Sequence, residues 1–222
     1  MRWKLFEGLP EDEVRELLAL ARRRRFARGE VVFHRGDPAD TVHLVAKGRF
    51  AVRIITPLGD SAILTVLGPG ELFGELALVH REAARTATVV SLDAGQTLSV
   101  HRRDFDRLRE RHPSSTEVLV CVLAGQVRRL SEHLVEALYV PADRRLLRRL
   151  LELADIYREN GEAPAIPLTQ EDIAELAGTS RATANKVLRD AEGRGELRLE
   201  RGRTVVLDAQ AIRRRAGVGV GG

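Results

Sequence analysis

The sequence predicts an α+β protein in which a β-rich amino-terminal part precedes a helical carboxy-terminal part. Three observations lead to this prediction. Short β-type runs separated by glycines fill residues 26–100, apolar residues then recur every three or four positions as far as residue 138, and two compact helices with a β-pair follow residue 167. With 222 residues, the chain is long enough for more than one domain.

Composition narrows the possible classes of protein. Apolar residues make up 44% and charged residues 31%, which is typical of a globular chain, and Cys121 is the single cysteine. One cysteine excludes a disulfide framework, a cysteine-rich zinc site and a cysteine-ligated iron–sulfur cluster. No apolar run reaches the ~18 residues that span a bilayer. We therefore expect a soluble, cytoplasmic protein, and its net charge of +4 is compatible with an anionic partner.

The first elements are a short helix and a set of strands. Residues 10–23 are expected to be helical, because Pro10 opens a segment with acidic residues at its positive end and apolar residues on one face. Many short β-type runs at this spacing then indicate an antiparallel sandwich or barrel. These runs are Val31–Phe33, Val42–Val45, Phe50–Ile55, Ala62–Val66, Thr86–Val90 and Thr97–Val100.

A long helix is expected after Pro113, ending near Leu138. Its apolar positions repeat with heptad spacing at Val120, Leu123, Val127, Leu130, Leu134 and Ala137. A 3.5-residue repeat keeps one stripe against a partner helix, so we predict a homodimer. The stripe could instead pack on the β-domain of its own chain, and a second apolar face allows both arrangements.

Pro141 interrupts the helical pattern, and Asp143 can help to cap a new helix over residues 144–157. We place the domain boundary at Tyr139–Asp143. The predicted division is therefore an amino-terminal domain over residues 1–112, a central helix over 113–140 and a carboxy-terminal domain over 141–222.

Residues 169–189 have the layout of a helix-turn-helix. Thr169 and Asp172 form a capping-box pattern, Gly178 supplies a left-handed turn residue, and Ser180 caps the second helix. Such a second helix enters the major groove of DNA, and the hairpin that follows, with its basic tip, is expected to form a wing that contacts phosphate.

Arg181 stands at the start of the second helix, where a guanidinium can bind guanine O6 and N7 together. The residues expected to contact DNA are Thr169, Gln170, Ser180, Arg181, Ala182, Thr183, Asn185, Lys186, Arg189 and Arg203.

A glycine-rich segment in the β-part has the character of a phosphate cassette. Gly74 lets a ligand approach the backbone, and the amides of Glu75, Leu76 and Ala77 would point at an anion. Arg85 can pair with a phosphate, and Thr86 adds a hydroxyl. Glu75 suits a ribose hydroxyl, so the combination suggests a cyclic nucleotide. The glycine spacing does not match the dinucleotide-binding fingerprint.

From these residues the chain resembles the cyclic-AMP receptor protein/fumarate–nitrate regulator (CRP/FNR) family of bacterial transcription factors. The resemblance covers residues 5–208 and includes the segment from Arg28 to Asp37, Phe73-Gly74-Glu75-Leu76, Arg85-Thr86-Ala87, the long helix and the helix-turn-helix. It implies a β-roll (jelly-roll) domain, a dimerising helix and a winged helix-turn-helix that binds palindromic promoter DNA.

The resemblance also implies roles for single residues. Cyclic AMP would be the effector, with Gly74 and Glu75 at its ribose, Arg85 and Thr86 at its phosphate, and Ser131 at the adenine amino group. The loop over residues 157–167 would contact RNA polymerase.

Two positions depart from the family pattern. Leu130 stands where cyclic-AMP-responsive members tend to have threonine, and Ala182 stands where the best-known members have a glutamate that reads cytosine. Base selectivity is therefore open, and the DNA half-site is expected to differ. An alternative is a regulator of the same fold that binds promoter DNA constitutively or with another effector.

No nucleophile elbow, Walker A loop or HExxH motif occurs, so no enzyme activity is expected. The six histidines show no metal-ligand spacing, which leaves haem weakly supported and predicts no metal site.

Overall fold

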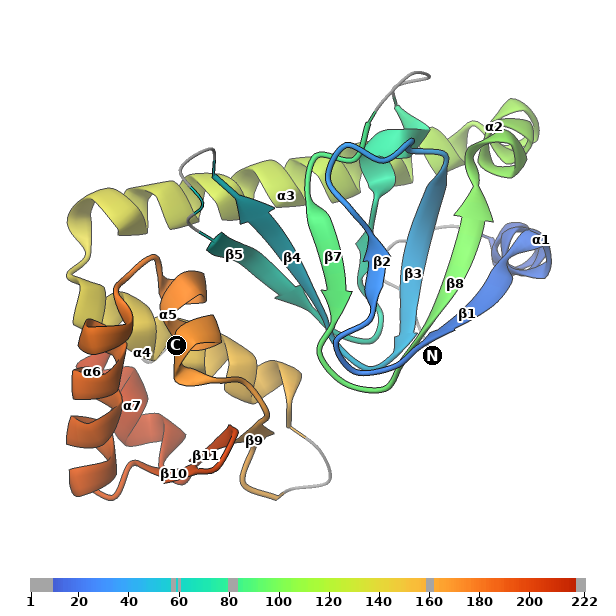
Figure 1. Ribbon diagram of the computed structural model, residues 1–222. Helices are drawn as coiled ribbons and strands as arrows, with labels where there is room; N and C mark the ends of the chain where they lie inside the picture. Colours follow the sequence, from blue (N-terminus) through green and yellow to red (C-terminus); the bar gives the residue numbers. More distant parts are fainter. Residues whose placement is uncertain (1–9, 57–58, 60, 80–83, 159–161, 219–222) are drawn as a thin grey trace. The chain divides into compact units, whose positions relative to one another are not determined.

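The computed structural model describes residues 10–56, 59, 61–79, 84–158 and 162–218. The chain divides into two compact units, whose elements are labelled in Figure 1. The first comprises Met1–Ile54 and Thr65–Leu130, and the second comprises Ile55–Leu64 and Ser131–Gly222.

Two four-stranded sheets form a β-sandwich (Figure 1). One sheet has the order β1-β8-β3-β6, made by Arg22–Phe26, Gly95–His101, Thr41–Lys47 and Leu72–Phe73. The other has the order β2-β7-β4-β5, made by Val31–Phe33, Thr88–Ser91, Phe50–Ile55 and Ser61–Leu67. Side chains from both sheets meet in one buried cluster of Phe26, Val45, Phe50, Leu67, Phe73 and Val89. The predicted sandwich is confirmed.

Strand β3 is buried on both faces, because a different cluster covers each of them, and successive side chains of the strand enter the two clusters alternately. Val42 and Leu44 join an apolar cluster with α1 (Glu11–Leu20), α2 (Arg102–Arg111) and the start of α3 (Ser114–Tyr139). On the opposite face of β3, Val45 joins the sandwich core, and the His43 ring stacks on Phe73.

The predicted helix over residues 10–23 is wrong at its end. Helix α1 stops at Leu20, and Arg22 begins β1, which pairs with β8 from Arg22↔Ser99 to Phe26↔Gly95. This segment is a strand because it hydrogen-bonds to β8, which lies far along the chain. Its four successive arginines show no alternation of apolar and polar residues that would predict a strand. The predicted strand over Thr86–Val90 is also too long, since β7 begins at Thr88.

Helix α3 has two different apolar faces. Leu119 is buried in the cluster with α1 and α2, and Val122 and Leu123 pack against that cluster. Seven large apolar side chains of the helix are exposed: Val120, Val127, Leu130, Leu134, Val135, Leu138 and Tyr139. We call these seven residues the α3 stripe. The stripe contains four of the six predicted heptad positions, whereas Leu123 is partly covered by its own chain.

The second unit is a small helical domain with a three-stranded sheet. Its helices are α4 (Ala142–Ile156), α5 (Gln170–Ala177), α6 (Arg181–Gly193) and α7 (Ala209–Arg215). Its sheet has the order β10-β11-β9, made by Leu197–Glu200, Arg203–Val206 and Ala165–Ile166. Pro141 occupies the cap position of α4, so Asp143 lies in the first turn and does not cap the helix as predicted.

Across the described ranges, no helix combines the length and the apolar character that a membrane crossing requires.

Candidate functional site

Arg85 lies in the loop before β7, and two hydrogen bonds fix its backbone to the turn at Gly36 and Asp37. The Arg85 amide donates to the carbonyl of Asp37 (2.8 Å), and the Arg85 carbonyl accepts from the amide of Gly36 (2.9 Å). This pairing turns the side chain into the first unit, where Arg85 is only 6% exposed.

Acceptors from the protein bind both terminal nitrogens of the Arg85 guanidinium. Nη1 donates to the carbonyl oxygens of Thr41 (2.8 Å) and Gly74 (3.5 Å), and Nη2 donates to Thr41 Oγ1 (2.8 Å). The guanidinium carbon lies 4.0 Å from the centre of the Phe33 ring, which is a cation–π contact. Burial lowers the pKa of Arg85, and three carboxylates oppose this shift: Asp40, Glu75 and Asp37.

Nε of Arg85 is buried and has no hydrogen-bond partner among the described residues. A buried donor left unpaired costs about 1–3 kcal/mol. A ligand acceptor could therefore bind at Nε, and an anionic acceptor would also offset the buried positive charge.

Gly74 permits the close approach of Arg85. Its φ of 80° is left-handed, and a Cβ on Gly74 would lie 2.6 Å from Arg85 Nη1. The buried Glu75 follows directly, opening the 3₁₀ helix η2 (Glu75–Leu78).

The prediction that three successive amides point at an anion is wrong for Ala77. Its amide donates to the Gly74 carbonyl (3.2 Å) within the turn. Within the described chain, Glu75 and Leu76 are the positions whose amides remain for a ligand. The other two predicted effector residues, Thr86 and Ser131, are exposed. Ser131 lies on α3 in the second unit, and its contact with a ligand remains a prediction.

A polar chain of side chains behind Arg85 was not foreseen from the sequence. His43 Nδ1 lies 3.0 Å from Thr97 Oγ1, and His43 Nε2 lies 3.4 Å from Thr41 Oγ1. Burial, with Arg85 and Arg24 nearby, lowers the pKa of His43 to about 3, so its ring is neutral. Thr41 and His43 could have been noticed as polar residues in an otherwise apolar strand.

The helix-turn-helix is confirmed in detail. Thr169 and Asp172 form the reciprocal capping box of α5, Gly178 ends that helix with φ 59°, and the Ser180 hydroxyl accepts from the Thr183 amide to cap α6. Both helices bury small residues: Ala174 and Ala177 on α5, and Ala184 and Ala191 on α6.

The exposed residues of α6 follow the prediction for four positions: Arg181, Ala182, Lys186 and Arg189. Asn185 is half-buried and engaged on both sides. Its Nδ2 donates to Gln170 Oε1 (2.9 Å), and its Oδ1 accepts from Arg189 Nε (3.1 Å). Asn185 therefore links α5 to α6 and orients two other predicted DNA contacts.

A pocket of about 280 Å³ separates the start of α5 from the wing. Thr169, Gln170, Arg181 and Arg203 are among its lining residues. The Arg203 guanidinium is paired with a carboxylate, because it donates to Glu200. Hydrogen bonds from Arg203 and Arg198 lower the pKa of Glu200.

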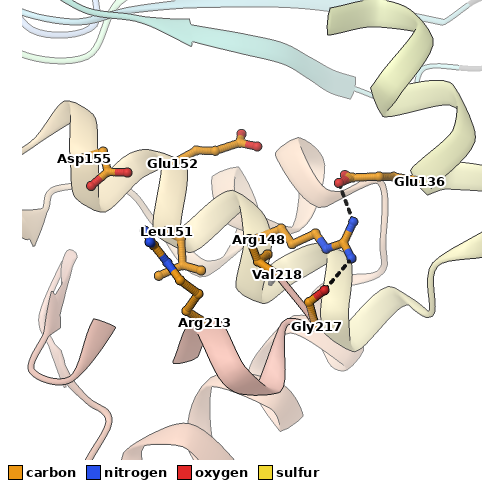
Figure 2. A pocket seen from close by; sticks show the side chains of 8 residues that line it. All are labelled: Glu136, Arg148, Leu151, Glu152, Asp155, Arg213, Gly217 and Val218. Atoms are coloured by element: carbon orange, nitrogen blue, oxygen red, sulfur yellow. Dashed lines mark hydrogen bonds and ion pairs between the residues drawn. The ribbon is translucent and has the colours of Figure 1, made fainter. Parts of the chain in front are cut away.

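Three arginines of α4 fasten the last turns of α3 within the second unit. Arg148 donates to Glu136 (2.7 Å) and to backbone carbonyls near the start of the carboxy-terminal tail, as Figure 2 shows for Gly217. Arg149 contacts Glu136 and His133, and Arg145 donates to carbonyls of α3 and of the α5–α6 turn.

Residues that make these contacts, Glu136 and Arg148 among them, line the pocket drawn in Figure 2, which is about 430 Å³ in volume. Each of its carboxylates, Glu136, Glu152 and Asp155, is already paired with an arginine.

Comparison with known proteins identifies both parts. Residues 23–112 match the cyclic nucleotide-binding domain model, and residues 144–215 match the Crp-like helix-turn-helix domain model. The chain is 31% identical over 215 residues to the "CRP-like cAMP-activated global transcriptional regulator" of Mycobacterium tuberculosis, with 96% of each chain covered. The chain belongs to the CRP/FNR family of transcription regulators.

Two further comparisons agree. The "Cyclic AMP receptor protein" of Thermus thermophilus is 32% identical over 208 residues, with 94% of each chain covered. A crystal structure of a CRP-family transcriptional regulator from the same organism matches with a TM-score of 0.76 and 27% identity, covering 89% of this chain and 98% of that one. This CRP/FNR member thus combines a cyclic nucleotide-binding domain with a DNA-binding helix-turn-helix.

The neutral buried His43 makes a prediction about acid stability. Its pKa is about 3 in the folded protein and 6.5 in the unfolded chain, so below pH 6.5 the unfolded chain takes up a proton that the folded protein does not. Lowering the pH from 7 to 5 should cost about 2 kcal/mol of unfolding free energy through this group alone.

Urea unfolding of the wild type and His43→Gln at both pH values measures this difference. The variant should lose about 2 kcal/mol less than the wild type between pH 7 and pH 5. Equal losses in both proteins would show that His43 is not held neutral.

Proposed function

We propose that this protein is a homodimeric transcription regulator whose binding to palindromic promoter DNA is controlled by cyclic AMP in the β-sandwich. The observation on which the effector assignment rests is the unpaired Nε of the buried Arg85. An anion beside it satisfies a buried donor and compensates a buried charge, which a neutral ligand cannot do.

The neighbours of Arg85 favour a cyclic nucleotide as this anion. Glu75 is a buried carboxylate one residue from Gly74, where it would repel a second phosphate charge but can accept from a ribose hydroxyl. A ligand with one phosphate charge and a ribose fits both groups. The names of the Mycobacterium and Thermus relatives point to cyclic AMP within this class. The proposed role is binding without catalysis.

The α3 stripe supports dimerisation. Its side chains are exposed on a helix whose first turns are packed through other residues, and a water-exposed apolar row of this length is typical of an interaction surface. A second copy of the same helix offers a matching row, and heptad spacing allows the two to pack side by side. We propose that residues 113–140 act as this dimerising helix between domains over residues 1–112 and 141–222.

For DNA, we propose that Arg181 reads a guanine and that Ala182 contacts a thymine methyl group, with Lys186 further along the groove. The remaining contacts go to phosphate and hold the helix in register: Thr169, Gln170, Ser180, Thr183, Asn185, Arg189 and Arg203. Two recognition helices of a dimer would be spaced about 34 Å apart, one turn of DNA.

Effector binding would then shift the population of conformations toward the one competent for DNA. Action on promoter DNA implies a cytoplasmic location. Contact with RNA polymerase through the loop over residues 157–167 belongs to the same proposal, and residues 159–161 of that loop lie outside the described residues.

The effector assignment is tested by titration calorimetry with cyclic AMP. The wild type should bind with micromolar affinity, and Arg85→Leu should bind at least about 100-fold more weakly, because the phosphate loses its charged donor. Arg25→Leu, an exposed arginine on β1, is the matched control and should bind as the wild type does. Circular dichroism checks that each variant is folded. Absence of heat with the wild type, or heat only with another cyclic nucleotide, would contradict the assignment of cyclic AMP.

Dimerisation is tested by sedimentation equilibrium of Leu134→Glu. A charge in the middle of the α3 stripe should convert the dimer to a monomer, because two buried carboxylates would face each other across the seam. Arg128→Glu introduces the same charge on the same helix outside the stripe and should remain dimeric. A dimeric Leu134→Glu protein would place the interface elsewhere.

Base reading by Arg181 is tested on an operator recovered by in vitro selection. Arg181→Ala should weaken binding to that operator by about 10- to 100-fold, because a bidentate contact to guanine is lost. The affinity for random DNA should fall only by the contribution of one positive charge to phosphate binding. Arg194→Ala removes an arginine that is paired with Asp190 at the far end of α6, and it should keep the ratio of specific to random binding. The same loss on both DNAs for Arg181→Ala would assign this residue to phosphate.

A further inference from the structure

We infer that Thr41 is a positioning residue for the effector: it holds one edge of the Arg85 guanidinium so that the opposite edge is presented to the phosphate. The inference rests on the proposed function, because it concerns how the proposed site recognises its ligand.

Counting the donors of Arg85 locates the free edge. A guanidinium has five N–H groups in one plane: one on Nε and two on each terminal nitrogen. Both hydrogens of Nη1 are used, by the carbonyls of Thr41 and Gly74, and one hydrogen of Nη2 is used by Thr41 Oγ1. Among the described residues no acceptor takes the hydrogen of Nε or the second hydrogen of Nη2.

These two hydrogens belong to the same edge. The Nη1 and Nη2 hydrogens that point to Thr41 form the end of the guanidinium, and Nε–H runs parallel to the remaining Nη2–H along its side. Two parallel N–H groups are the geometry with which arginine binds two oxygens of one phosphate or carboxylate. The unused donors are therefore a ready bidentate fork.

Thr41 is suited to hold the opposite end. Its carbonyl and its hydroxyl lie at the same distance, 2.8 Å, from the two terminal nitrogens. It is the first residue of β3, and its β-branched side chain restricts rotation about χ1. One residue thus fixes the in-plane orientation of the guanidinium.

The polar chain behind Thr41 orients its hydroxyl. The neutral His43 ring can accept the Thr41 hydroxyl hydrogen at Nε2, while its Nδ1–H donates to the buried Thr97. A hydroxyl that donates toward His43 turns a lone pair toward Arg85 Nη2. The stacking of His43 on Phe73, with ring centres 5.0 Å apart and planes 5° from parallel, keeps the ring in place.

The cation–π contact with Phe33, whose ring centre lies 4.0 Å from the guanidinium carbon, is a further restraint on the position of the guanidinium. With these restraints in place, Arg85 can bind phosphate without giving up its contacts to Thr41. The opposite arrangement, in which Thr41 competes with the phosphate for Arg85, predicts tighter effector binding when the hydroxyl is removed.

The test is titration of cyclic AMP into Thr41→Val and Thr41→Ser. Valine keeps the shape and the carbonyl but lacks the hydroxyl, so Thr41→Val should bind about 10-fold more weakly, whereas Thr41→Ser should stay within about 2-fold of the wild type. Thermal unfolding reports whether both variants are folded. Wild-type affinity or tighter binding in Thr41→Val overturns the inference.

A double-mutant cycle separates positioning from a merely structural role. In the Arg85→Lys background the fork is absent, so Thr41→Val should cost less than about 2-fold there, while in the Glu75→Gln background it should still cost about 10-fold. An equal loss in the Arg85→Lys background overturns the inference. Where Arg85→Lys binds too weakly for calorimetry, the contrast between valine and serine decides by itself. Failure of the wild type to bind any cyclic nucleotide refutes the proposed function instead, and so the two failures are distinguishable.

Discussion

The structure depends most on the burial of the Arg85 guanidinium, whose Nε edge has no acceptor among the described residues. Removing a cation from water is unfavourable unless it is paired, and Arg85 has acceptors and an aromatic face but no direct ion pair in the described structure. The sandwich core, the positive φ of Gly74 and the backbone contacts of Asp37 and Gly36 all serve to hold this side chain. A site built in this way has a preformed preference for an anion, and recognition of the remainder of the ligand is added to that preference.

Helix α3 has different neighbours along its length, because its beginning belongs to the first unit and its end to the second. Its first turns are packed into the apolar cluster of the first unit, while its last turns are bound by Arg145, Arg148 and Arg149 to the helices that carry the recognition helix. Polar and charged contacts make the second junction, and Arg149, which pairs with Glu136 there, is buried, so breaking that pair is costly. The α3 stripe is exposed along the same helix.

Much of this could be predicted from the sequence, because local rules determine it. The capping box at Thr169, the left-handed Gly178 and the cap at Ser180 are local patterns, and each is confirmed. The long helix and most strands follow from periodicity. What the sequence does not show is long-range: β1 exists because β8 lies beside it, and the amide of Ala77 is used within its own turn. Thr41 meets Arg85 across 44 positions of the chain, so nothing local connects them. The effector contacts of Thr86 and Ser131 remain predictions.

The arginine run of β1 has a consequence for how copies of the protein meet. β1 lies at the edge of its sheet, and Arg22, Arg23, Arg24 and Arg25 are all exposed on it. An edge strand offers unpaired backbone groups to any other strand, and a second copy brought alongside would place two runs of positive charge next to one another. This repulsion disfavours extension of the sheet through β1, and with it the growth of fibres from that edge.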